Sequence, residues 1–73
     1  MNNAELALEK MKSRLNALSN EQIIEAFEAT YTVTDDSIFI VRGVIMDVLQ
    51  ERDLVKFDAW IESGDESPRV YFI

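Results

Sequence analysis

The chain has 73 residues, enough for a single small domain over residues 1–73, and it contains neither cysteine nor histidine. These absences exclude disulfides, thiolate and imidazole catalysis and the usual ligands of zinc, copper and haem, so we expect no metal and no cofactor. The formal charge of −7 has the wrong sign for binding a nucleic acid backbone, and we expect no direct nucleic acid binding.

Catalytic signatures are missing as well. The two glycines, Gly43 and Gly64, are far apart, so no glycine-rich loop can hold a phosphate group. Carboxylates, lysines, tyrosines and serines are the only possible catalysts, and their spacing in the sequence matches no known catalytic motif. We therefore expect no catalytic residue and a protein that is not an enzyme.

Charge is distributed unevenly along the chain. Residues 1–20 hold three basic and two acidic side chains, a net charge of +1. Residues 21–73 hold four basic and twelve acidic side chains, a net charge of −8. The acidic excess either keeps a small protein in solution or forms a surface that imitates nucleic acid.

The first predicted helix covers residues 4–18. Its apolar side chains recur at steps of three and four, a spacing typical of a helix that packs against one partner helix. This seam consists of Ala4, Leu8, Met11, Leu15 and Leu18. Asn2, with Glu5 three residues later, offers an N-terminal cap.

A second helix is predicted at residues 20–30. Ser19 and Gln22 have the spacing of a capping box, in which each side chain bonds the backbone amide of the other residue. Ile23, Ile24 and Phe27 then lie on the inward face.

The apolar stretch from residue 37 to 49 has two interpretations. Threonine-rich residues 30–34 and the returning apolar residues favour a hairpin over residues 30–42, which would give an α+β fold. Asp35 or Asp36 as an N-cap, followed by a long run without a strong turn signal, favours a helix at residues 36–52. We favour the helix, and with it an all-α bundle of three to four helices. Gly43 then lies inside a helix, which predicts close approach of another helix unless a turn occurs there.

A fourth helix is predicted at residues 53–63, capped by Asp53 and ended by Gly64. Ser67 and Pro68 favour extended backbone, so the apolar residues that follow predict an extended C-terminal tail. This tail is expected either to close the core or to dock on a partner subunit.

Four segments resemble small uncharacterised acidic helical proteins carried by bacterial phages, plasmids and integrative elements. The segments are LSNEQIIEAF, VRGVIMDVLQERD, FDAWIES and ESPRVYFI. The resemblance covers residues 18–73. It implies a mobile-element context and a helix over residues 37–52. It assigns a role to no individual residue.

No membrane span and no secretory signal are expected, because the apolar runs are short and interrupted by charges, and a cytoplasmic location follows as the default. We expect a protein–protein interaction or regulatory protein that forms a homodimer and binds a protein partner of unknown identity. Association would supply the stability that a chain this short lacks. The predicted interface residues are Ile40, Val44, Met46, Trp60, Tyr71, Phe72 and Ile73.

The alternative function is an acidic mimic of nucleic acid that inhibits a DNA-binding or defence enzyme. This function requires carboxylates arrayed on one continuous face. The candidates are Glu21, Glu25, Glu28, Asp47, Glu51, Asp58 and Glu62.

Overall fold

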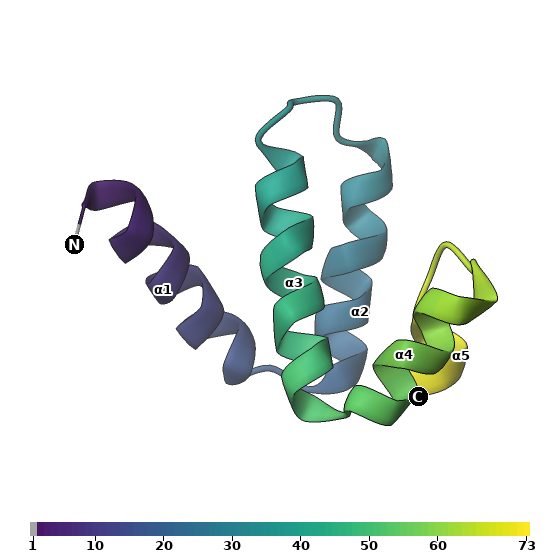
Figure 1. Cartoon of the computed structure of the whole chain (residues 1–73). Coiled ribbons are helices and arrows are strands. Elements are labelled where there is room, and N and C mark those ends of the chain that lie inside the picture. Colours follow the sequence, from purple (N-terminus) through teal and green to yellow (C-terminus); the bar gives the residue numbers. More distant parts are fainter. Residues whose placement is uncertain (1) are drawn as a thin grey trace.

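The computed structural model describes residues 2–73, and this part of the chain is all-α, as predicted (Figure 1). Its elements are α1 (Asn3–Asn16), α2 (Asn20–Ala29), the single turn η1 (Thr30–Thr32), α3 (Ile38–Arg52), α4 (Leu54–Ser63) and the short α5 (Arg69–Phe72). The four longer helices match the predicted ranges to within two residues at each end. No strand occurs within residues 2–73, so the alternative hairpin over residues 30–42 is wrong.

The α2 and α3 helices run in opposite directions side by side at the centre of the fold (Figure 1). The α1 helix packs on one side of α3, and α4 and α5 lie on the other side of this central pair. One core joins these elements, and its fully buried side chains come mainly from α2 and α3: Ile23, Ile24, Phe27, Ile45, Val48 and Leu49.

Local caps set the helix boundaries. The capping box at the start of α2 is present, with Ser19 and Gln22 each bonding the other's backbone amide at 3.1 and 3.0 Å. The Asn2 side chain accepts a hydrogen bond from the amide of Glu5, and Asp53 accepts one from the amide of Lys56. Gly64 ends α4 in the left-handed conformation with φ 75°, which glycine adopts without strain.

Two local expectations are corrected. The α3 helix begins after Ser37, and Asp35 accepts a hydrogen bond from the Ser37 amide, which forms a turn before the helix. The C-terminal residues are not an extended tail, because Pro68 is buried and precedes one helical turn that places Phe72 in the core. Proline tolerates this position because the first residues of a helix need no amide donor.

Gly43 is not a packing glycine. It lies on the exposed side of α3, and a Cβ added there would meet no atom within 4 Å, so no other helix approaches it. The predicted close approach is therefore wrong.

Replacing Gly43 with alanine is expected to stabilise the chain by about 1 kcal/mol, because alanine loses less backbone entropy in a helix and meets open space. Urea denaturation followed by Trp60 fluorescence measures the change. Gly64→Ala is the matched control and is expected to destabilise by about 1 kcal/mol, because its positive φ disfavours a side chain. A loss of stability in Gly43→Ala would contradict the open environment described here.

Candidate protein interface

The apolar seam of α1 is only half covered. Leu15 is buried against the core, and Met11 and Leu18 are half-buried beside it. Nearer the start of α1, Leu8 is 37% exposed and Ala4 is exposed. Figure 1 shows the reason: α1 leans away from α3, so the two helices separate toward their N-terminal ends.

This divergence leaves a hollow between the first halves of α1 and α3, which we call the α1–α3 wedge. Its volume is about 360 Å³. All but one of its lining residues are apolar: Ala4, Ala7, Leu8, Met11, Ile40, Val41 and the single polar residue Ser37. Ile40 is 56% exposed, and the neighbouring Phe39 is 67% exposed. An apolar hollow with exposed aliphatic walls is typical of a surface that binds another protein.

Two basic side chains fix the other end of α1. The Arg52 guanidinium, at the end of α3, donates hydrogen bonds to the side chain of Asn20 and to backbone carbonyls where α1 ends: Leu15, Asn16 and Leu18, at 3.3, 3.2 and 2.7 Å. The Lys12 ammonium donates to Glu51 at 2.6 Å, and this hydrogen bond raises the pKa of Lys12. Both side chains hold the second half of α1. The uncovered part of the seam lies in the first half.

The structure distributes the predicted interface residues between core and surface. Val44, Trp60 and Phe72 are enclosed by the chain's own side chains, with 8%, 4% and 5% of their surface exposed. We leave these three out of the candidate interface. The half-buried residues are Met46 and Tyr71, and the exposed ones are Ile40 and Ile73. Of these seven, Ile40 alone lines the α1–α3 wedge.

Trp60 is a core residue with a satisfied polar atom. Its indole N–H donates to the carbonyl of Asp65 at 2.7 Å. Its ring packs edge-to-face with Phe27 and Phe57, at centroid distances of 5.5 and 5.8 Å. A buried tryptophan with its donor satisfied stabilises the fold and presents nothing to a partner.

The interface residues predicted from the sequence do not include Leu8, which lines the α1–α3 wedge, or Phe39, which is 67% exposed. Leu8 belongs to the predicted seam, whose spacing predicts packing against one partner helix. The angle between α1 and α3 determines how much of that seam is covered, and seam spacing carries no information on this angle.

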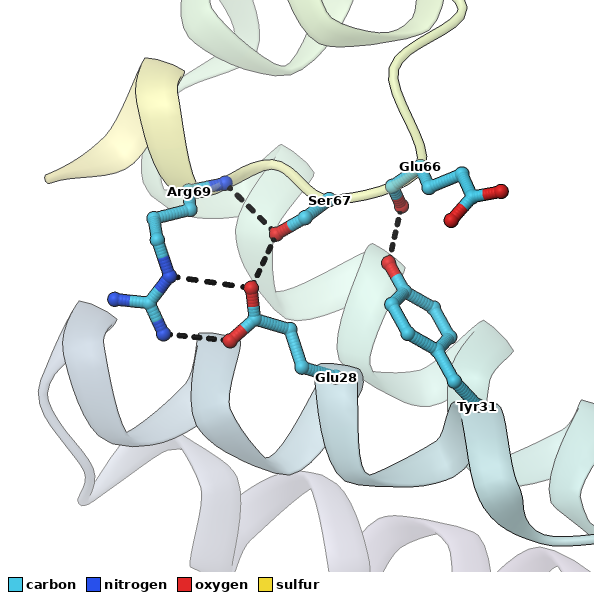
Figure 2. Close-up of polar contacts among 5 residues, drawn as sticks. All are labelled: Glu28, Tyr31, Glu66, Ser67 and Arg69. Carbon is cyan, nitrogen blue, oxygen red and sulfur yellow. Dashed lines mark hydrogen bonds and ion pairs between the residues drawn. The ribbon is translucent and has the colours of Figure 1, made fainter.

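The predicted acidic face is divided into separate groups. Glu28 forms an ion pair with Arg69 at 2.6 Å and accepts a hydrogen bond from Ser67, and both interactions lower the pKa of Glu28 (Figure 2). The Glu28 hydrogen bond, followed by the charges of Glu25 and Glu21, raises the pKa of Arg69. These three carboxylates of α2 therefore lie near the same cation, on the α5 side of the fold.

Asp47 and Glu51 lie near Lys12 on the α1 side, and their charges help to raise the pKa of Lys12 after the Glu51 hydrogen bond. Asp58 and Glu62 are exposed on α4. Since α1 and α5 lie on opposite sides of the central pair, the structure does not gather these carboxylates on one continuous face (Figure 1).

The loop after α4 is held against α2 and η1 by side chains. The Tyr31 hydroxyl donates to the carbonyl of Glu66, and Ser67 and Arg69 both bond Glu28 (Figure 2). The Glu66 side chain points away from this group in the same view. These contacts are structural, because they position α5 and close the core on that side.

No group of three or more Asp or Glu side chains within residues 2–73 is arranged to hold a metal ion. In the same part of the chain, no helix has the length and apolar character needed to cross a membrane. Comparison with known protein families, with curated proteins and with solved structures finds no match for this chain.

Proposed function

We propose that the chain is a non-enzymatic protein–protein interaction or regulatory protein that associates with itself through the α1–α3 wedge. The observation that carries this proposal is the wedge's almost wholly apolar lining, which includes Ile40 at 56% exposed. We also propose a cytoplasmic setting and, from the resemblance of its segments, a mobile-element context.

The balance of covered and uncovered apolar side chains supports association. Among residues 2–73, as many large apolar side chains are exposed as form the buried core. A chain of 73 residues gains little net stability from its own core, so burial of this surface between copies would stabilise the fold. The free energy available is about 25 cal/mol for each Å² of apolar surface removed from water.

Mimicry of nucleic acid receives less support from the geometry. Glu28 and Glu51 are already paired with cations of the same chain, and the remaining candidates lie on different sides of the fold. A mimic needs an uninterrupted row of unpaired charges with the spacing of a nucleic acid backbone. We therefore propose the apolar wedge, rather than the acidic surface, as the binding site.

Replacing Ile40 with aspartate is expected to weaken self-association at least about tenfold, because it places a charge in an apolar interface. The substitution lies in the first turn of α3, where a carboxylate favours the helix, so the fold is expected to persist. Sedimentation velocity at micromolar concentration measures the association, and far-UV circular dichroism checks the fold.

Val70→Asp is the matched control, because Val70 is 79% exposed on α5, away from the wedge. The control is expected to associate like the unmodified chain. Equal association of Ile40→Asp and the unmodified chain would show that the wedge is not the interface.

A further inference from the structure

We propose that the surface filling the wedge is an exposed stripe of α4 from a second copy of this chain. This inference rests on the proposed function and names the partner of the same site. Its support is a match of shape and charge between α1 and α4.

The receiving surface is longer than the wedge. A second hollow of about 350 Å³ lies along α1 and is lined by Ala7, Lys10, Met11, Arg14, Leu15 and Leu18. It borders the same side chains, Ala7 and Met11, as the wedge, and we call the surface that the two hollows form together the α1 channel. The channel follows α1 from Ala4, and the helix from there to Asn16 is about 18 Å long.

Two unpaired cations flank the α1 channel. Lys10 and Arg14 are exposed and lie four residues apart, on the same side of the helix. Neither makes an ion pair or a side-chain hydrogen bond within residues 2–73, in contrast to Lys12. They are therefore available to carboxylates of another molecule.

The α4 helix carries a complementary surface, which we call the α4 stripe. Leu54, Val55 and Ile61 are 55%, 79% and 50% exposed. Val55 lies on the side of the helix away from buried Phe57 and Trp60, while Leu54 and Ile61, three and four residues from Phe57, border the buried side. Asp58 and Glu62 lie among them, four residues apart and exposed, and neither makes an ion pair in the described chain. The ten residues of α4 span about 15 Å, which fits within the channel.

The charges of the two surfaces match in sign and in spacing. Each pair is separated by four residues, about 6 Å along its helix, so Lys10 and Arg14 can face Asp58 and Glu62 while the apolar side chains meet. A symmetric pairing of two α1 channels would instead bring the cations of both copies together, which is unfavourable. Charge complementarity therefore selects the α4 stripe as the occupant.

This contact cannot form within one copy. The α1 and α4 helices lie on opposite sides of the central α2–α3 pair (Figure 1). Each copy therefore offers one α1 channel and one α4 stripe to other copies, and the contact is between unlike surfaces.

Charge reversal tests the pairing. One variant carries Lys10→Glu and Arg14→Glu, and a second carries Asp58→Lys and Glu62→Lys. All four residues are exposed, so both variants are expected to keep the circular dichroism spectrum of the unmodified chain. Each variant alone is expected to associate at least about tenfold more weakly, because like charges then face each other. An equimolar mixture is expected to regain association, since every α1 channel again finds an α4 stripe of opposite charge.

Sedimentation velocity of each variant and of the mixture gives the result. Unchanged association of either variant alone, or failure of the mixture to associate, would overturn the α4 assignment. The single variants Lys10→Glu and Asp58→Lys are compared with the controls Lys56→Glu and Asp36→Lys, which change the net charge by the same amount but lie outside both surfaces. Both controls are expected to associate like the unmodified chain. If a control and its matched variant weaken association equally, the effect comes from net charge alone, and the proposed pairing is wrong.

The Ile40→Asp variant separates the two proposals. If Ile40→Asp weakens self-association while each charge-reversed variant still associates on its own, the wedge is the interface and the α4 stripe is not its occupant. If Ile40→Asp and the charge reversals all leave association unchanged, both proposals are wrong.

Discussion

Replacement of Phe27 with alanine is expected to destabilise the chain by about 3 to 5 kcal/mol, the range for a large aromatic side chain lost from a packed core. Phe27 is 2% exposed, and its contacts join α2 to η1, α3 and α4. Its ring packs edge-to-face with Tyr31 and Trp60, at centroid distances of 5.7 and 5.5 Å, and the Arg42 guanidinium lies 5.0 Å from its centroid. These contacts add to the loss from burial alone.

The expected loss is large for a protein of this length. Domains are stabilised by roughly 0.05 to 0.15 kcal/mol per residue, so a chain of 73 residues has about 4 to 11 kcal/mol in total. Phe27→Ala is therefore expected to be partly unfolded at 25 °C. Urea denaturation at sub-micromolar concentration, followed by Trp60 fluorescence, measures the loss without a contribution from association.

Phe39→Ala is the matched control for Phe27→Ala. Phe39 is 67% exposed at the start of α3, so its removal is expected to change stability by less than about 0.5 kcal/mol. Similar losses for the two phenylalanines would contradict the position of the core described here.

Replacement of Arg52 with methionine is expected to destabilise the chain by about 2 to 3 kcal/mol and to release α1. Methionine retains much of the apolar stem but leaves the carbonyls of Leu15 and Leu18 without their charged donor. A cation at the end of α1 also interacts favourably with the negative end of that helix. Arg52→Lys is expected to recover only part of the loss. The guanidinium directs several N–H donors in one plane at separate oxygens, and an ammonium group cannot do this.

Hydrogen exchange locates the effect of Arg52→Met. Amides of α1 are expected to exchange faster than in the unmodified chain, while those of Ile45, Val48 and Leu49 stay protected relative to α1. Lys56→Met is the control, because Lys56 is exposed and its side chain has no partner within residues 2–73. Unchanged protection of α1 in Arg52→Met would show that Arg52 does not anchor this helix.

The helices were predictable because their signals are local. The Ser19–Gln22 capping box, the Asp53 cap and the Gly64 stop each act within about one turn, so the spacing of a few residues is sufficient to identify them. The α1 seam was predicted correctly in its second half, since Met11, Leu15 and Leu18 pack at the core, whereas Ala4 and Leu8 are exposed.

The angle of α1 and the position of the C-terminal residues depend on contacts between distant parts of the chain. Arg52 reaches Leu15 and Leu18 across 37 and 34 residues, and Arg69 reaches Glu28 across 41. No short-range spacing encodes such contacts. Sequence analysis therefore missed Arg52 as the anchor of α1 and expected an extended tail where a helical turn forms.

The candidate interface was predictable only in part for a related reason. The α3 helix is apolar on nearly every side, so its sequence does not distinguish Val44, which is buried, from Ile40, which is exposed. Large apolar residues such as Trp60 and Phe72 suit a core and an interface equally well. Which of them are covered depends on how the other helices pack around α3.

The central claim is that this chain associates through apolar surface left uncovered by its own fold. Sedimentation equilibrium of the unmodified chain at micromolar concentration tests it most directly. The predicted result is a mass of at least twice the 8.4 kDa of one copy, falling to the single-copy mass on dilution. A stable 8.4 kDa monomer that unfolds cooperatively at every concentration would contradict the claim.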